Sequence, residues 1–373
     1  MFRESITIGH IFGIPVKLHF SFLLILPFLA YAFGLNIETL SDYTGISADQ
    51  LQVDPFLLGF MMVVGLFISV ILHELAHSLV ARQKGMTIKS ITLMIFGGVA
   101  EIDELTENPE EEALIAFAGP LLSLLLGVVL AGIPTLLRGL FVDLRFILLY
   151  LGQMNLFLAI FNLIPAFPTD GGRIMRSLIA NRMPFLKATK ISASLGKGFA
   201  FVFGILGLIS GNFILLFIAL FIYIAASQEY QMTLIKSTLS GLTVSDLMTD
   251  EVSTVKEEMS VEDLLQRMYR ERHSGYPVVK NGRLTGCVTM EDIKKITSEE
   301  YPRRTVREIM TTEVKTVGPE EELQKALKIL SREDIGRLMV TENNELVGII
   351  TRSDIIKGFH LRQLQEEIDE PYN

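Results

Sequence analysis

The residues with the clearest chemical potential are two histidines and a glutamate, in the pattern His-Glu-Leu-Ala-His at residues 73–77. On a helix, residues four apart share one face, so the imidazoles of His73 and His77 can converge on one metal ion. Glu74, next to the first histidine, can then exchange protons with a water that completes the metal's shell. The pattern lies inside an apolar run, residues 56–81. Ionisable groups are costly in hydrocarbon, so this placement favours a functional metal site.

A catalytic zinc site usually has three protein ligands, and Asp170 is the best candidate for the third. It lies in residues 162–172, where prolines and paired glycines interrupt an apolar segment. Irregular backbone at membrane depth is tolerated where it lines a cavity. Two alternatives stay open. Asp170 can instead cap a helix over residues 171–182, and Asn162 can either satisfy backbone groups freed by Pro165 or hold the carbonyl of a peptide under attack.

Six apolar segments are long enough, or nearly so, to cross a bilayer, which takes roughly 20 residues each. Lys and Arg occur before the first segment and after the second and fourth, whereas the loop 36–55 has four acidic residues and no Lys or Arg. The positive-inside rule therefore predicts a multi-pass cell-membrane protein with both termini in the cytoplasm. The segments are residues 19–35, 56–83, 112–133, 145–167, 191–210 and 212–232.

Between the second and third segments, residues 86–102 are rich in β-branched side chains and are broken by Gly97-Gly98. This pattern predicts a β-hairpin or a short sheet at the membrane surface. The third segment then carries Ala118-Gly119-Pro120, small residues that permit close approach between helices.

Residues 243–373 contain an internal repeat. The pattern Gly-x-x-Thr-x-x-Asp at 286–292 recurs at 348–354, and residues 244–248 match residues 306–310, always 62 residues apart. One constant offset indicates duplication of a folding unit. The turns Asn281-Gly282 and Asn343-Asn344 suit tight hairpins. The predicted helices are 260–271 and 321–331, and the predicted strands are 276–280, 284–289, 337–341 and 346–351.

Composition excludes several classes of protein. The chain has 373 residues, of which 50% are hydrophobic, and its mean hydropathy of +0.42 is too high for an ordinary soluble enzyme. Lys and Arg number 33 against 42 Asp and Glu, and no basic stripe is present, so nucleic acid is not an expected partner. Cys287 is the single cysteine, which rules out a disulfide within the chain and suits a small core residue.

Four motifs of residues 1–235 jointly resemble the site-2 protease family of intramembrane zinc metalloproteases. The resemblance implies one catalytic zinc ion per chain, bound by His73, His77 and Asp170. It also implies that Glu74 is the catalytic base and that Asn162 assists. The implied reaction is cleavage, within membrane lipid, of a transmembrane segment of a membrane-anchored protein substrate. The motifs are residues 73–77, Phe96-Gly97-Gly98, Ala118-Gly119-Pro120 and Asn162 with Pro165 and Asp170-Gly171.

A transmembrane helix resists hydrolysis because its amides are hydrogen-bonded internally, so such a substrate has to unwind first. We expect the exposed edge around Leu93–Val99 to receive the unwound segment as an added strand. The residues predicted to form this substrate edge are Leu93, Ile95, Phe96, Gly97 and Gly98.

The duplicated unit resembles the CBS domain, which pairs in tandem. The resemblance implies a regulatory ligand such as AMP, ATP or S-adenosyl methionine, and a homodimer formed through the CBS domains. An Asp can accept hydrogen bonds from ribose hydroxyls while a Thr reaches phosphate. The alternative is that the same Asp residues only start helices. The predicted nucleotide-binding residues are Thr289, Asp292, Thr351 and Asp354.

The expected fold is a polytopic α-helical membrane protein, with six transmembrane helices and a small membrane-associated β-sheet, followed by a cytosolic α/β tandem CBS module. The expected function is zinc-dependent endoproteolysis within the membrane, modulated by an adenine nucleotide. The alternative is a CBS-regulated transporter or channel, which leaves the pattern at 73–77 unexplained. The expected domains are 1–235 (transmembrane zinc protease), 236–242 (linker), 243–299 and 300–361 (CBS domains) and 362–373 (acidic C-terminal tail).

Overall fold

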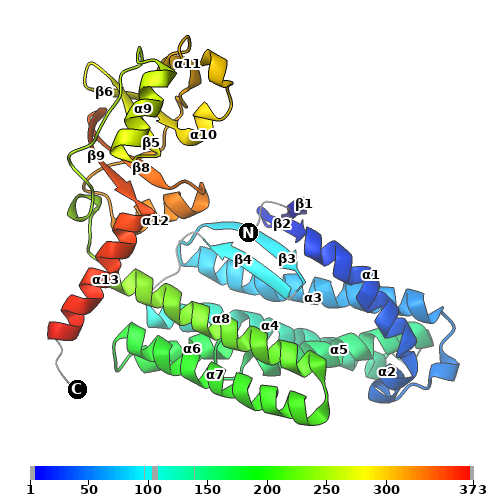
Figure 1. Ribbon diagram of the computed structural model, residues 1–373. Helices are drawn as coiled ribbons and strands as arrows, with labels where there is room; N and C mark the ends of the chain where they lie inside the picture. Colours follow the sequence, from blue (N-terminus) through cyan, green and yellow to red (C-terminus); the bar gives the residue numbers. More distant parts are fainter. Residues whose placement is uncertain (1–4, 96, 103–107, 138, 370–373) are drawn as a thin grey trace. The chain divides into compact units, whose positions relative to one another are not determined.

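The structure is a computed structural model that describes residues 5–95, 97–102, 108–137 and 139–369, with side chains through Gln365. The chain divides into two compact units, Met1–Gln231 and Met232–Asn373. The first unit is mostly helical and carries a four-stranded sheet, whereas the second combines shorter helices with a five-stranded sheet (Figure 1).

Two long helices of the first unit, α3 (Pro55–Gln83) and α4 (Pro109–Leu136), begin at capping residues. The Asp54 carboxylate accepts hydrogen bonds from the amides of Phe56 and Leu57. Pro55, whose ring presets a helical φ, takes the first position of α3. Asn108 caps α4 in the same way. The helices are α1 (Phe20–Leu35), α2 (Ile37–Thr44), α3 (Pro55–Gln83), α4 (Pro109–Leu136), α5 (Val142–Asn162), α6 (Asp170–Ala180), α7 (Phe185–Ser210) and α8 (Phe213–Thr238).

Within the described residues, five helices are long and apolar enough to cross a membrane: α3, α4, α5, α7 and α8. The number rises to six if α1 and α2, which are bent by 73° at their junction, form one span. The expectation of a helical core with several apolar helices of membrane-spanning length is therefore confirmed. The predicted interruption of the apolar segment 145–167 is present, because α5 ends at Asn162. The reason is that Pro165 and Pro168 lack the amide hydrogen that a continuing helix needs.

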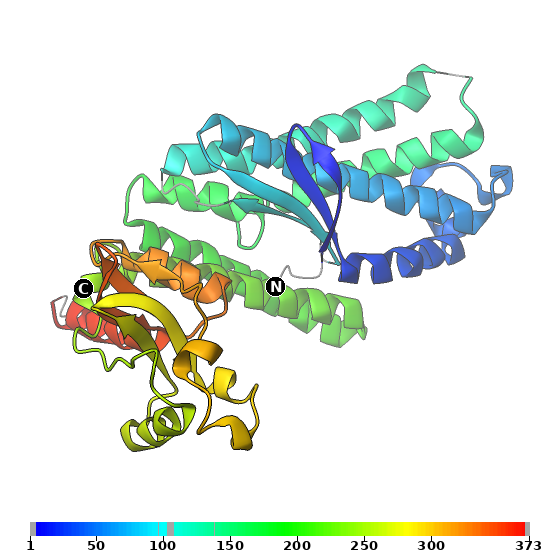
Figure 2. The ribbon, with the colours of Figure 1, turned by 90° about the horizontal axis from the view of Figure 1, so that it is seen from above.

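A sheet with the strand order β1-β2-β3-β4 packs against α3 (Figure 2). Its second hairpin, β3–β4, confirms the hairpin predicted within residues 86–102. The first hairpin, β1–β2, was not predicted. Its strand β2 joins the sheet by pairing in parallel with β3, where Val16 lies beside Ile91, and local patterning does not encode such distant pairing. The strands are β1 (Ser5–Ile11), β2 (Ile14–His19), β3 (Ile88–Met94) and β4 (Gly97–Ile102).

The second unit shows the predicted repeat as two hairpins, β5–β6 and β8–β9, that join in one sheet of order β5-β6-β9-β8-β7. Asn281 and Asn343 open the hairpin turns with φ of 52° and 50°, the left-handed backbone that such tight turns require. The strands are β5 (Gly275–Lys280), β6 (Arg283–Thr289), β7 (Thr316–Val317), β8 (Arg337–Glu342) and β9 (Glu345–Thr351), and the helices are α9 (Val261–Glu271), α10 (Met290–Ile293), α11 (Val306–Ile309), α12 (Leu323–Arg332) and α13 (Arg352–Asp369).

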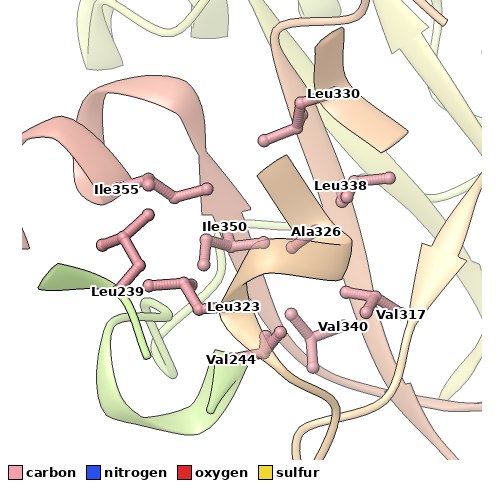
Figure 3. Close-up of a cluster of buried hydrophobic side chains, with 10 residues drawn as sticks. All are labelled: Leu239, Val244, Val317, Leu323, Ala326, Leu330, Leu338, Val340, Ile350 and Ile355. Atoms are coloured by element: carbon pink, nitrogen blue, oxygen red, sulfur yellow. The ribbon is translucent and has the colours of Figure 1, made fainter. Parts of the chain in front are cut away.

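A buried apolar cluster holds the second repeat together (Figure 3). Leu239, which directly follows α8, is 1% exposed and belongs to this cluster, with Leu323 and Ile350. The carbonyl oxygen of Lys236, near the end of α8, accepts a hydrogen bond from Gln324 at 2.9 Å. The last turns of α8 are therefore part of the second unit's fold.

Candidate metal centre

Three side-chain atoms from two helices form a compact triangle. The Nε2 atoms of His73 and His77 are 3.1 Å apart, and Oδ2 of Asp170 lies 3.2 Å from each of them. The histidines are one turn apart on α3, and Asp170 is the first residue of α6. Both imidazoles are buried. The structure thus brings together the three residues that were predicted to bind a metal.

The hydrogen bond at Nδ1 of each imidazole, the outer nitrogen, determines whether Nε2, the inner nitrogen, has a lone pair for a metal ion. Nδ1 of His77 lies 2.7 Å from the backbone carbonyl oxygen of Ile115, which can only accept, so this nitrogen carries the hydrogen. Nδ1 of His73 lies 2.8 Å from the hydroxyl oxygen of Ser123, which can accept in the same way. Both inner nitrogens then present lone pairs toward the Asp170 carboxylate. Three acceptors this close repel one another unless a cation lies between them.

The dimensions of the triangle suit zinc. Zinc binds nitrogen and oxygen ligands at about 2.0–2.2 Å in a tetrahedral arrangement, which places neighbouring ligand atoms roughly 3.3 Å apart. The observed separations of 3.1 Å and 3.2 Å are close to that spacing. Three protein ligands leave the fourth position for water, which is the arrangement of catalytic rather than structural zinc sites.

Gly119 explains how α4 can come so close to the two imidazoles. A Cβ atom at this position would overlap Nε2 of His77 and would lie 2.7 Å from Nε2 of His73. Any larger residue would therefore occupy the space between the ligands. The glycine at 119 has its reason here, at the metal centre.

The paired glycines after Asp170 let α6 begin tightly against the preceding loop. A Cβ on Gly171 would lie 2.5 Å from the carbonyl of Leu163, and one on Gly172 would lie 2.5 Å from the amide nitrogen of Phe167. The N-cap residue is Thr169 rather than Asp170. The Asp170 carboxylate is therefore available to the histidines.

Glu74 lies beside the sheet. A Cβ on Gly98 would be only 2.6 Å from Cγ of Glu74, so β4 needs a glycine where it passes this side chain. The predicted substrate edge differs in one respect. Leu93 belongs to the interior strand β3 and is 1% exposed, so the edge strand of this hairpin is β4. Ile95 is exposed in the turn, and Phe96 lies outside the described residues.

Asn162 is the last residue of α5, and its Nδ2 donates to the Leu158 carbonyl oxygen in its own helix at 3.0 Å. A contribution to the metal centre stays a prediction. Another asparagine was missed by sequence reasoning. Asn155 is fully buried, and its Nδ2 donates to Oγ of Ser69, one turn before His73 on α3, at 2.9 Å.

The four predicted nucleotide-binding residues form two equivalent capping boxes. The amide and hydroxyl of Thr289 donate to Oδ2 of Asp292 at 3.0 Å and 2.8 Å, and Thr351 contacts Asp354 at 3.0 Å and 2.7 Å. Burial opposes ionisation of Asp292, but hydrogen bonds from Lys295 and Thr289 outweigh it and lower its pKa. Both acids therefore start helices, and nucleotide binding by them stays a prediction.

Comparison with known proteins identifies both parts of the chain. The profile of peptidase family M50 matches residues 61–142 and 138–203, and the CBS domain profile matches residues 244–299 and 306–360. A zinc metalloprotease of Methanocaldococcus jannaschii is 36% identical over 370 residues, which cover 98% of this chain and 99% of that protein. A solved site-2 protease from the same organism is 36% identical and covers 61% of this chain and 95% of its own, with a TM-score of 0.43. The solved CBSX2 in complex with AMP is 28% identical over 34% of this chain and 99% of its own, with a TM-score of 0.30.

Apolar helices around a histidine–carboxylate triangle, followed by a duplicated unit, define a membrane zinc protease with a tandem CBS pair. The chain belongs to peptidase family M50. Its activity is that of a zinc metalloprotease, which confirms the expected enzyme class and the resemblance to site-2 proteases. The alternative of a transporter or channel is left without support.

Proposed function

We propose that the chain hydrolyses transmembrane segments of membrane-anchored proteins at a single zinc centre formed by His73, His77 and Asp170. One observation carries the proposal. Three acceptor atoms lie 3.1 Å and 3.2 Å apart, partly or fully buried, and two of them belong to α3, a helix apolar enough to cross a membrane. A cation at the centre relieves the repulsion among these lone pairs, and the open fourth position of a zinc ion suits a reacting water.

A bound zinc ion would acidify the attacking water and polarise the peptide carbonyl. Glu74 takes a proton from that water at its carboxylate and delivers it to the leaving amine. Asn162 can orient the peptide carbonyl by donating a hydrogen bond from Nδ2. Nδ2 carries two hydrogens, so it can donate one to the substrate while the other remains on the Leu158 carbonyl oxygen.

The unwound substrate segment adds as a strand to the free edge of β4. Two observations support this proposal. β4 is the last strand of the sheet, and Gly98 lies against the side chain of Glu74. A strand paired with β4 therefore carries its peptide bonds past the catalytic base. Gly97 and Ile95, at the start of this edge, are further substrate contacts, whereas Leu93 supports the edge from inside the sheet.

In the membrane, α1 and α2 together form one bent span, which makes six spans with both termini and the CBS pair in the cytoplasm. Lipid surrounds α7 and α8, where large apolar side chains such as Phe201, Phe213 and Phe217 are exposed. The domain boundaries proposed are those expected from the sequence: 1–235, 243–299 and 300–361, with the linker 236–242 and the C-terminal segment 362–373, which continues α13 as far as residue 369.

The CBS pair regulates the protease by binding an adenine nucleotide or S-adenosyl methionine, and it joins two chains in a homodimer. Support comes from the duplicated Thr–Asp pairs. Thr289 with Asp292 and Thr351 with Asp354 present the same groups at the same place in each repeat. Each carboxylate uses Oδ2 for its own helix start, which leaves Oδ1 of Asp354 for a ribose hydroxyl.

The decisive experiment compares wild type with Glu74→Gln on a membrane-anchored reporter that contains a single transmembrane segment. The variant keeps the size of the side chain and removes its acid–base function. We expect at least ~100-fold less product, with one zinc per chain retained. Glu110→Gln, at an exposed residue in the first turn of α4, is the matched control and should cleave normally. Undiminished cleavage by Glu74→Gln, or by zinc-free wild type, would refute the proposal.

A further inference from the structure

A buried arginine joins three helices beside the metal centre. Arg176 on α6 is 4% exposed. Its Nε donates to Oε2 of Glu112 on α4 at 3.2 Å, and its Nη2 makes a second contact with the other oxygen of the same carboxylate. Its Nη1 donates to Oε1 of Glu229 on α8 at 3.0 Å. The hydroxyl of Ser177 adds a hydrogen bond to Glu112 at 3.0 Å.

Aromatic rings complete the surroundings of this guanidinium. Its central carbon lies 4.9 Å from the ring centre of Phe167 and 4.6 Å from that of Phe185. A buried charge is tolerated when it is paired and its hydrogen-bonding groups are satisfied. The planar guanidinium of Arg176 meets Glu112 at two points, which fixes direction as well as distance. The pair therefore holds α6 in one position against α4.

Both helices joined by this pair reach the metal centre. α6 begins with Asp170, and α4 supplies the Ile115 carbonyl and the Ser123 hydroxyl that orient the two imidazoles. A shift of α6 relative to α4 therefore changes the separation between the Asp170 carboxylate and the histidines. The contact between Arg176 and Glu112 is one of the contacts that maintain that separation.

Glu229 has a different role in the cluster. Glu112 pairs with Arg176, and Glu229 lies between two cations of α6 because it also interacts electrostatically with Arg173. The Glu229 side chain is 28% exposed, compared with 10% for Glu112. It lies on α8, which runs to Thr238 without a break, and Leu239 directly after it is in the core of the second unit. A displacement of α8 therefore reaches Arg176 through Glu229.

We infer that Arg176 is a positioning residue for Asp170, and that its contact with Glu229 couples the metal centre to the CBS pair through α8. The inference rests on the proposed function, because the CBS pair has to bind an adenine nucleotide. Coupling between two binding sites is reciprocal. If nucleotide shifts α6, then zinc at the metal centre changes the affinity for nucleotide by the same factor. The coupling can therefore be measured by binding alone, without a substrate.

The experiment uses the full-length protein, purified with zinc or stripped of metal by a chelator. The dissociation constant for ATP is measured in both forms for wild type, Glu229→Gln and the control Glu110→Gln. For wild type, and equally for the control, the dissociation constants for ATP with and without zinc should differ by about 5-fold or more. For Glu229→Gln the two constants should agree to within about 2-fold, because the neutral side chain no longer holds Arg176. Glu229→Asp, which keeps the charge at shorter reach, should give an intermediate ratio.

Two results would overturn the coupling: a Glu229→Gln ratio equal to that of wild type, or a wild type that binds ATP equally well with and without zinc. A wild type that binds no ATP would remove the nucleotide part of the proposed function and this coupling with it. Zinc-dependent cleavage by that same protein would leave the proposed protease chemistry intact, so the failures are distinguishable.

Discussion

Replacing Gly119 by alanine tests the metal centre with a single methyl group. The added Cβ would overlap Nε2 of His77 and lie 2.7 Å from Nε2 of His73, whereas real Cβ atoms essentially never approach another heavy atom within 3.0 Å. Neither imidazole can turn away freely, because Ile115 and Ser123 hold their outer nitrogens at 2.7 Å and 2.8 Å. Either a ligand leaves its position or α4 retreats from α3.

The size of the effect follows from the tolerance of a zinc site. Ligand distances are maintained to about ±0.2 Å, and the overlap forces a movement larger than that. Loss of a group that only supports a ligand costs about 10–100-fold in metal affinity. Direct displacement of a ligand should cost more, so we expect Gly119→Ala to bind zinc at least ~100-fold more weakly than wild type.

The assay is competition for zinc between the purified protein and a chelator of known affinity, together with cleavage of the membrane-anchored reporter. Gly132→Ala is the matched control. It lies on the same helix, and a Cβ there would meet nothing within 4 Å. This control should bind zinc normally and gain about 0.5–1 kcal/mol of helix stability. Normal zinc affinity in Gly119→Ala would show that the histidine pair is not the metal centre.

Three further predictions concern Ser123 and Gly98 near the metal centre and Cys287 in the second unit. Ser123→Ala removes the partner of His73 Nδ1 and should weaken zinc binding about 10–100-fold in the same chelator competition; unchanged affinity would show that the hydroxyl does not orient the ring. Gly98→Ala pushes a Cβ to 2.6 Å from Cγ of Glu74, so cleavage of the reporter should slow about 10–100-fold while zinc content, measured in parallel, stays normal. Burial raises the pKa of the Cys287 thiol to about 11, so at pH 8 iodoacetamide should modify the folded protein at least ~10-fold more slowly than the unfolded chain, and faster as the pH rises toward 10. Equal rates in the folded and unfolded protein would contradict that burial.

Some features could be predicted from the sequence because they depend only on local geometry. His73 and His77 share a helix face because an α-helix repeats every 3.6 residues, which holds wherever the helix is placed. The hairpin turns at Asn281 and Asn343 depend on backbone preferences of a few residues. The tandem units follow from a constant offset of 62 residues. Asp170 was found differently, from the need for a third ligand and from an unusual break in an apolar segment.

Groups that orient the site come from distant parts of the chain, and nothing local marks them. Ser123 and the Ile115 carbonyl are an ordinary side chain and a backbone atom of an apolar helix, and only the packing of α4 on α3 directs them at the imidazoles. The parallel pairing of β2 with β3, which leaves β4 as the free edge, also depends on residues far apart. The sequence alone therefore determined which residues come together as a possible metal site and that a tandem CBS pair follows them. The tertiary structure decided how those ligands are held, because the register between packed helices depends on many contacts at once.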